Sequence, residues 1–216
     1  MYDIVFASNN KGKWLELYKD FERENINLIL SKDHLNLIEN DQILNINSFS
    51  KAESAAKQTG LMALGDDSGL CCTSLGYAPG VNSRRWFGSP ADDKGRNRKL
   101  LELMEEYKGD DEREAFLISH FTLVDKDGRK LFTTFVKNRF IIADEIHDDH
   151  GFGYDAILIP DKNLVAVAVA ENRIKPERAV EIIQKRLTIG QLSQEEKNAI
   201  NDRGRIAKEI KKYLLE

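Results

Sequence analysis

One polar segment near the start of the chain combines hydroxyl, amide and ammonium groups: Ser8, Asn9, Asn10, Lys11, Gly12 and Lys13. It follows the apolar run 4–7 and precedes a run with helical spacing. A helix N-terminus offers unpaired N–H groups and a positive dipole, so the segment suits phosphate, with Asn10 and Lys13 adding a donor and a charge. Its glycine spacing is not that of a Walker A loop. A polar helix cap without a ligand is therefore the alternative.

A second segment places two carboxylates side by side, Asp66 and Asp67, after the apolar run 61–64. We expect this run to be a strand that ends at the pair. Adjacent carboxylates repel each other unless a cation or a specific pairing neutralises them. Such oxygen ligands, with Glu39 and Asp41 upstream, suit Mg²⁺ or Mn²⁺, and one carboxylate would take a proton from an attacking water. An ordinary Asp-Asp-Ser-Gly turn is the alternative.

A third segment, residues 151–155, alternates glycine with aromatic rings in the order Gly-Phe-Gly-Tyr-Asp. Glycine permits close approach of the backbone to a ligand, and an aromatic face can stack on a base. The alternative is a tight turn with an aromatic residue in the core. The four histidines show no His-x-x-x-His spacing, so they do not indicate a metal site.

The elements that must position these segments alternate between strands and helices. Strands are expected at 4–7, 27–30, 61–64, 114–125, 130–142, 156–160 and 164–170. Helices are expected from Lys11, at 49–56 and 92–107, from Pro176, after the Ser193–Glu196 capping box, and at 206–214. Residues 76–90 are expected to form a long functional loop. This order predicts an α/β fold with a mixed sheet.

The composition restricts the class of ligand and the compartment. Lys and Arg total 32 and Asp and Glu total 36, a formal charge of −4, which argues against sequence-independent binding of nucleic acid. Cys71 and Cys72 are adjacent, so they form a poor disulfide pair and a poor zinc site, and a reducing cytoplasm is the simplest setting. The longest apolar run, 164–170, is too short to span a bilayer, and no signal peptide is visible. We expect one cytoplasmic domain over residues 1–216, with no membrane partner.

Taken in order, the segments resemble the inosine triphosphate pyrophosphatase family, also called XTP/dITP diphosphatases. The resemblance covers residues 1–161 and 188–212. Five segments carry it: Phe6 to Lys13 with Glu16-Leu17, Lys51-Ala52, Gly65 to Leu70 with 78–81 and 83–88, Gly151 to Asp155, and Glu196-Lys197 with Arg203-Gly204. Any one segment alone would be weak evidence for the family, but five segments in the same order and spacing are specific for it.

The resemblance implies a fold, an activity and an assembly. The fold would be α/β, with a long mixed β-sheet flanked by helices and two lobes that enclose a central cleft. The activity would be metal-dependent hydrolysis of a non-canonical purine nucleoside triphosphate, such as ITP, dITP or XTP, to the monophosphate and pyrophosphate. The protein would be a homodimer and would use Mg²⁺, with Mn²⁺ as the alternative.

The resemblance also implies a role for each site residue. Residues from Ser8 to Lys13, together with Lys51, would hold the triphosphate. Glu39 and Asp67 would bind the metal, and Asp67 would also activate water. Support for Asp67 would come from Asp66 and Ser68. The nucleoside pocket would consist of Phe152 stacked on the base, with Gly153, Tyr154, Asp155, Lys197 and Arg203.

Three departures from the family pattern stand out. Asn201-Asp202 replaces the family's Ser-His before Arg203. We expect either that Asp202 contacts the base and alters the base preference, or that it pairs with a neighbouring Arg or Lys at the surface. Residues 46–48 read Ile-Asn-Ser where the family has Glu-Asn-Ala. Residues 162–187 look like the insertion of a strand and a helix.

Two other functions remain open on the same scaffold. One is a catalytically idle nucleotide-binding or regulatory protein, which the changed base-reading residues would fit. Retention of Glu39, Asp67, Lys13 and Lys51 argues against it, because a sensor needs no water-activating carboxylate. The other is a pyrophosphatase for canonical nucleotides or modified pyrimidine nucleotides.

Overall fold

The computed structural model describes residues 2–21, 25–31, 35–38, 42–88, 92–147, 151–201 and 203–216. The chain forms two compact units. The first unit contains Met1–Ser68, Ile118–Val136 and Asp202–Glu216, and the second contains Gly69–Leu117 and Lys137–Asn201. Three strands pass from one unit into the other: β3 (Met62–Cys72), β5 (Glu114–Val124) and β6 (Lys130–Ile142).

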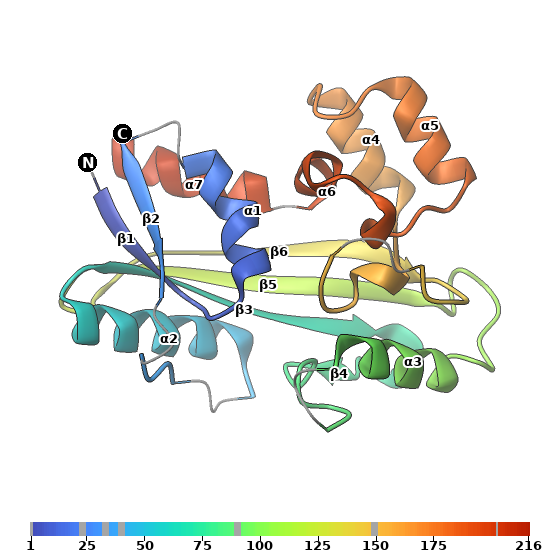
Figure 1. The fold of residues 1–216 in the computed structure, drawn as a ribbon, viewed down its shortest axis with the longest axis horizontal. Coiled ribbons are helices and arrows are strands. Elements are labelled where there is room, and N and C mark those ends of the chain that lie inside the picture. Colours follow the sequence, from blue (N-terminus) through green and yellow to red (C-terminus); the bar gives the residue numbers. More distant parts are fainter. Residues whose placement is uncertain are drawn as a thin grey trace. The chain divides into compact units, whose positions relative to one another are not determined.

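The strands pair in the order β2-β1-β3-β5-β6-β7, and β4 pairs with β3 (Figure 1). The remaining strands are β1 (Tyr2–Ala7), β2 (Ile26–Leu30), β4 (Pro79–Gly80) and β7 (Leu158–Pro160). β1 is parallel to β2 and β3, whereas the β3–β4 and β6–β7 pairs are antiparallel. The predicted mixed α/β sheet is therefore confirmed.

The first unit buries both faces of its sheet, as the apolar run in β1 requires. Side chains alternate between the faces of a strand. Ile4 and Phe6 accordingly pack in one cluster with residues of α1 (Lys11–Phe21) and α7 (Arg203–Leu215), while Val5 packs with α2 (Leu44–Thr59). Figure 1 shows α1 and α7 on one side of β1 and α2 on the other. The expected first helix and C-terminal helix are confirmed.

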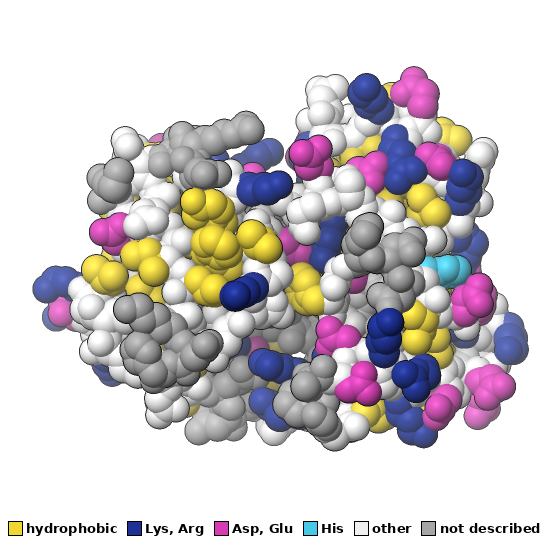
Figure 2. All heavy atoms as spheres, viewed as in Figure 1, with side chains coloured by type: hydrophobic (Ala, Val, Ile, Leu, Met, Phe, Trp, Pro, Cys, Tyr) yellow, Lys and Arg dark blue, Asp and Glu magenta, His cyan; other side chains and the backbone are white. Residues whose placement is uncertain are grey.

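Helix α1 is amphipathic, although its outer face is not wholly polar. Leu17 and Phe21 are fully buried, whereas Leu15 is 45% exposed. Figure 2 shows apolar side chains gathered over α1 on the viewed face. The inner face of α1 fixes the helix against the sheet and so sets the position of its N-terminus.

Helix α2 approaches β3 so closely that only glycine fits at residue 65. A Cβ atom on Gly65 would overlap the backbone oxygen of Ser48 and press on the backbone nitrogen of Ala52. Neither atom belongs to a flexible side chain, so the helix itself would have to move. The close approach brings the next residues of β3 within reach of the side chains of α2.

We expect Gly65→Ala to destabilise the protein by about 3 kcal/mol or more, because overpacking against backbone cannot be relieved by a rotamer change. Gly60→Ala is the matched control: nothing lies within 4 Å of its added Cβ, but its φ is +69°. That strain alone should cost about 1–2 kcal/mol. Urea unfolding of both variants measures the difference, and a smaller loss for Gly65→Ala would disprove the close-packing argument.

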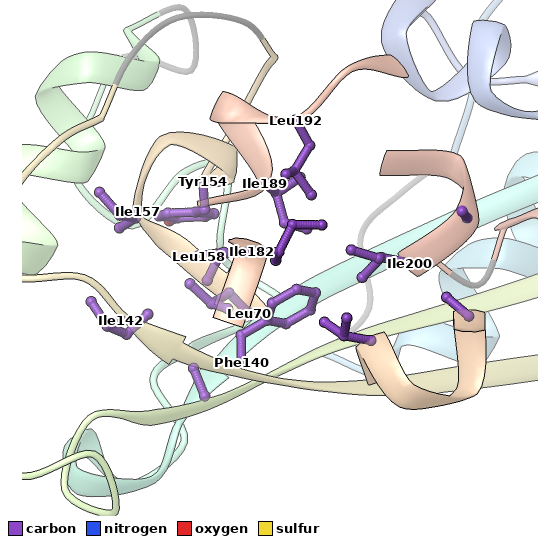
Figure 3. Close-up of a cluster of buried hydrophobic side chains, with 14 of the residues drawn as sticks. Leu70, Phe140, Ile142, Tyr154, Ile157, Leu158, Ile182, Ile189, Leu192 and Ile200 are labelled. Carbon is purple, nitrogen blue, oxygen red and sulfur yellow. The ribbon is translucent and has the colours of Figure 1, made fainter. Parts of the chain in front are cut away.

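The second unit has its own hydrophobic core, in which Leu70, Phe140 and Ile182 come from three different elements (Figure 3). Its helices are α3 (Asp93–Leu103), α4 (Lys162–Ala170), α5 (Pro176–Gln184) and α6 (Gln194–Ile200). Short 3₁₀ turns cover Thr73–Leu75, Asp155–Ile157 and Ile189–Gln191. The expected helix from Pro176 and the Ser193–Glu196 capping box are confirmed.

Three expectations about elements are wrong. Residues 164–170 belong to helix α4 rather than a strand: Asp161 caps the helix by accepting a hydrogen bond from the Asn163 N–H at 2.8 Å. The segment 162–187 therefore contributes two helices, not a strand and a helix. Strand β3 does not end at the carboxylate pair, because its residues beyond Gly69 pair with β4. Helix α3 ends at Leu103, earlier than expected.

One further expectation about a segment has a mixed outcome. The expected loop 76–90 contains strand β4, and its residues 89 and 90 lie outside the described part. Among the described residues, no helix has both the length and the apolar character to cross a bilayer.

Candidate active site

The predicted phosphate-binding segment lies between the end of β1 and the first turn of α1. The Asn10 side chain caps the helix, since its Oδ1 accepts a hydrogen bond from the Lys13 N–H at 3.1 Å. The Ser8 Oγ accepts from the Asn10 N–H at 3.2 Å, and Ser31 donates to the Ser8 carbonyl at 3.0 Å. Lys11 is exposed. These bonds confirm the predicted cap and hold the loop in a conformation that presents the helix N-terminus.

The two adjacent carboxylates are bound from opposite faces of β3. The Lys13 ammonium of α1 lies 3.2 Å from Asp66 Oδ1 and donates to the Ser68 Oγ at 2.5 Å. On the α2 side, the Lys51 ammonium lies 2.8 Å from Asp67 Oδ1. Side-chain alternation along the strand separates the carboxylates. The strand thus relieves the repulsion between Asp66 and Asp67 that their adjacency in the sequence indicated. Residues 66–69 belong to β3, so the alternative of an ordinary Asp-Asp-Ser-Gly turn is wrong.

Asp67 has a second partner that the sequence did not single out. The Asn47 amide donates to Asp67 Oδ2 at 3.0 Å. Asn47 and Lys51 are four residues apart on α2, so they share a helix face and grip both oxygens of one carboxylate. Asp67 is 5% exposed and Lys51 is 6% exposed. The Asp67 carboxylate is therefore held in one orientation. It lies on the part of β3 that extends past the end of the neighbouring strand β1.

Asp66 belongs to a buried chain of charges on the α1 and α7 side. Arg203, the first residue of α7, forms an ion pair with Glu16 and lies 3.6 Å from Asp66 Oδ2. Burial alone would raise the pKa of Asp66, but the charges of Lys13 and Arg203 outweigh it and hold that pKa below its ordinary value. Burial lowers the pKa of Lys13, which the charge of Asp66 opposes. The Asp66 carboxylate is accordingly ionised.

Among the described residues, the formal charges around this strand segment cancel. Three carboxylates, Glu16, Asp66 and Asp67, lie against three cations, Lys13, Lys51 and Arg203. Burial lowers the pKa of His120, and the charge of Asp67 opposes that shift only in part, so the histidine is neutral at pH 7. A polyphosphate that enters this neutral cluster would bring an excess of negative charge.

Four residues that the sequence predicted for the site require separate comment. Glu39 and Asp202 lie outside the described residues, as does Asp41, so their assigned roles stay predictions. Arg203 was predicted to contact the base. In the structure its buried guanidinium binds Glu16 and faces Asp66, so it supports the carboxylates, and a contact with the base stays a prediction.

The donor set fits a hard divalent cation. Asp67 offers two carboxylate oxygens; both accept hydrogen bonds, from Lys51 and Asn47, but a carboxylate has further lone pairs for a metal. Asp66 Oδ2, on the other face of β3, is buried and forms no hydrogen bond with the described residues. Within the described ranges, no group of three or more His, Cys, Asp or Glu side chains gathers to hold a metal. Mg²⁺ commonly uses one or two carboxylates and takes its other ligands from water and substrate phosphates. The residues present therefore match that mode of binding.

The predicted base-binding segment forms a compact group in the second unit. The Lys197 ammonium lies 4.3 Å from the centroid of the Phe152 ring and forms an ion pair with Asp155. The Asp155 carboxylate also accepts from the Phe152 N–H at 3.0 Å. The neighbouring Gly153 is held from α3, since its N–H donates to Asp93 Oδ2 at 2.7 Å. Phe152, Gly153, Asp155 and Lys197 thus lie together, and their role in binding a base stays a prediction.

Tyr154 is the exception within this group. It is buried in the core, and its hydroxyl donates to the Ser83 carbonyl at 2.7 Å. Burial raises the pKa of this phenol. The contacts favour the core aromatic that the sequence left open, and a role for Tyr154 in a nucleoside pocket stays a prediction.

The sequence assigned no role to four residues that position the predicted ones. Glu16 and Asn47 do so in the first unit, and Asp93 and Asn97 in the second, where Asn97 donates to the Gly153 carbonyl at 3.1 Å. The sequence held a signal for two of them. Glu16 lies one helical turn after Lys13, and Asn47 is the one residue of 46–48 that is the same as in the family pattern. No local signal pointed to Asp93 or Asn97.

The fold and site define a class of protein: an α/β protein whose first unit places lysines and carboxylates beside a helix N-terminus, an arrangement suited to polyphosphate chemistry. Residues 4–213 match the Ham1 family, and the chain belongs to it.

Named relatives and a solved structure agree with this family. The chain is 34% identical over 171 residues to a dITP/XTP pyrophosphatase of Leifsonia xyli subsp. xyli, covering 78% of this chain and 84% of the relative. It is 34% identical over 211 residues to a dITP/XTP pyrophosphatase of Acinetobacter baumannii, covering 93% and 89%. The structure is similar to a HAM1 protein from Coxiella burnetii, with a TM-score of 0.77, 31% identity and coverage of 100% and 99%.

Proposed function

We propose that this protein hydrolyses non-canonical purine nucleoside triphosphates, such as dITP, ITP and XTP, to the monophosphate and pyrophosphate. The observation that carries the proposal is the buried Lys51–Asp67–Asn47 group beside the capped N-terminus of α1. A phosphate cradle and an oriented carboxylate are what hydrolysis of a phosphoanhydride requires. Membership of the Ham1 family supports the assignment.

The triphosphate is bound by the α1 N-terminus together with Lys13 and Lys51. The free N–H groups of the helix and the two ammonium groups neutralise phosphate oxygens, and the residues from Ser8 to Asn10 shape the loop. Both lysines already contact carboxylates. Charge that develops on the leaving pyrophosphate therefore meets cations whose positions are fixed before substrate binds.

Asp67 activates the attacking water. Lys51 and Asn47 orient its carboxylate, so that an oxygen can accept the water's proton as the bond to phosphorus forms. A bound Mg²⁺, or Mn²⁺ in its place, would neutralise phosphate charge and favour attack by water. Asp66 and Ser68 hold the Lys13 ammonium from the other face, and Glu39 would add a metal ligand.

The base is bound in the second unit by Phe152 and Lys197. The Lys197 ammonium lies over the Phe152 ring, so a base would stack on the ring's other face or exchange with the ammonium. Asp155 fixes Lys197 and the backbone of Phe152. We also propose that the protein acts as a homodimer, which light scattering of the purified protein would test.

A pyrophosphate-release screen tests the function. Purified protein would be assayed with dITP, ITP, XTP, GTP, ATP and the pyrimidine triphosphates, each with Mg²⁺ and with Mn²⁺. We expect the highest kcat/KM for a 6-oxopurine outside the canonical set. Preference for a pyrimidine triphosphate would favour the other pyrophosphatase, and tight binding without turnover would favour the idle nucleotide-binding protein.

The residue at position 202 gives a prediction about base preference. An ionised aspartate accepts hydrogen bonds only, so it would favour base N–H donors, including the N1–H and 2-amino groups of guanine. We expect Asp202→His to lower the kcat/KM for GTP relative to ITP by about 10–150-fold, the range for a buried bond to a charged group. If the GTP, XTP and ITP ratios do not change, Asp202 pairs with a neighbouring cation and does not read the base.

A further inference from the structure

Helices α4 and α5 touch the helix that carries Lys197, and Arg178 makes the principal polar contact. The Arg178 Nε lies 2.6 Å from Glu196 Oε1, and one of its terminal nitrogens lies 3.2 Å from Glu196 Oε2. A second terminal nitrogen lies 2.6 Å from Glu181 on the next turn of α5. Both oxygens of Glu196 are thus held by one guanidinium whose own position is fixed from α5.

Glu196 is also the residue that fixes the start of α6. Its side chain accepts from the Ser193 N–H at 2.9 Å, and the Ser193 hydroxyl accepts from the Glu196 N–H at 3.2 Å, a complete capping box. The next residue is Lys197, which is 3% exposed and reaches Asp155 and the Phe152 ring. A shift of the first turn of α6 would therefore move the Lys197 ammonium.

We propose that Arg178 is a positioning residue for Lys197, acting through Glu196, so that the helix pair 162–187 tunes the affinity of the nucleoside pocket. The inference rests on the proposed function, because it assigns Lys197 to substrate. Arg178 does not touch substrate. It fixes the carboxylate that caps α6, and the cap fixes the ammonium over Phe152.

Other contacts keep the helix pair attached to α6 when Arg178 is replaced. Arg173 donates to the Ala199 carbonyl, and Val165, Ala168 and Ile182 share a hydrophobic cluster with Ile200. Removing the Arg178 guanidinium should therefore loosen the first turn of α6 without unfolding the second unit. This separation makes a kinetic test possible.

Arg186 supplies a matched control from the same segment. Its guanidinium also forms a two-point ion pair, with Asp110 at 2.9 and 3.0 Å, but this pair does not involve α6. Arg178→Ala should raise the KM for dITP about fivefold with kcat little changed, the loss expected for one partly exposed pair. Arg186→Ala should leave both constants at the wild-type level. Arg178→Lys should fall between, because an ammonium lacks the planar fork with which the guanidinium binds both oxygens of Glu196 and also Glu181.

A double-mutant cycle with Lys197→Met separates positioning from general destabilisation. If Arg178 acts through Lys197, then Arg178→Ala should raise KM about fivefold in the wild type and have no further effect in Lys197→Met. Equal effects in both backgrounds would overturn the proposal, as would a KM for Arg178→Ala that matches Arg186→Ala. A melting temperature of Arg178→Ala close to that of Arg186→Ala shows that the fold is retained.

The same cycle keeps this inference distinct from the proposed function. If Lys197→Met leaves the KM of every nucleoside triphosphate unchanged, the assignment of Lys197 to substrate is wrong and the inference is overturned with it. If Lys197→Met raises KM while Arg178→Ala does not, the proposed function stands and only the positioning role is overturned.

Discussion

Asp67→Asn should lower kcat for dITP by about 100–10,000-fold while the fold is retained, the range for loss of a general base. The asparagine would keep the size of the carboxylate and could still accept from Asn47, but it could neither take the water's proton nor balance the Lys51 charge. Its amide would also be a poorer metal ligand than a carboxylate. The loss should appear in kcat more than in KM, because the proton moves only in the transition state.

Asp127→Asn is the control for this substitution. Asp127 lies in the turn between β5 and β6, its side chain is 54% exposed, and it should tolerate the same change without loss. Circular dichroism and the melting temperature of both variants establish that the fold is intact. A folded Asp67→Asn enzyme that keeps most of its activity would remove Asp67 from the mechanism.

Removal of divalent cations should abolish turnover. The carboxylates and cations described around β3 already cancel one another, so nothing within that group compensates the additional charge of a triphosphate. A divalent cation shared by the phosphates and Asp67 would supply that compensation. Assays in excess EDTA should show background rates.

Readdition of Mg²⁺ should restore the rate, and the melting temperature without substrate should change little on chelation, because the described carboxylates around β3 are already paired with cations. Turnover at the full rate in excess EDTA would contradict the metal-dependent mechanism. A large loss of stability on chelation would instead indicate a structural metal, which the neutral cluster does not require.

Local signals were sufficient for the parts of the fold that local chemistry determines. A polar helix cap was one interpretation of the segment 8–13, and Asn10 is the residue that caps α1, while Ser193 with Glu196 forms the predicted capping box. In each case the bonding groups lie within three residues of each other, so their spacing in the sequence already defines the contact. The apolar run 4–7 likewise predicted a strand, and it lies in β1.

The errors, and one contact that the sequence did not show, arose where distant contacts decide the structure. A continuous apolar run such as 164–170 is compatible with either a buried strand or a buried helix. In the structure it forms helix α4, which buries Val165 and Ala168 on one face. The Arg203–Glu16 ion pair joins residues 187 positions apart, so no spacing rule could show that this arginine supports Asp66. The two carboxylates were expected at a strand end, and pairing with β4 instead extends β3 beyond them.

Hydrolysis of dITP in oxygen-labelled water, followed by mass spectrometry of the products, tests the central claim most directly. Attack by the water that Asp67 activates should break the bond between the α-phosphate and pyrophosphate. The labelled oxygen should then appear in dIMP, with unlabelled pyrophosphate as the only other product. Label in pyrophosphate, or release of dIDP and inorganic phosphate, would contradict the account.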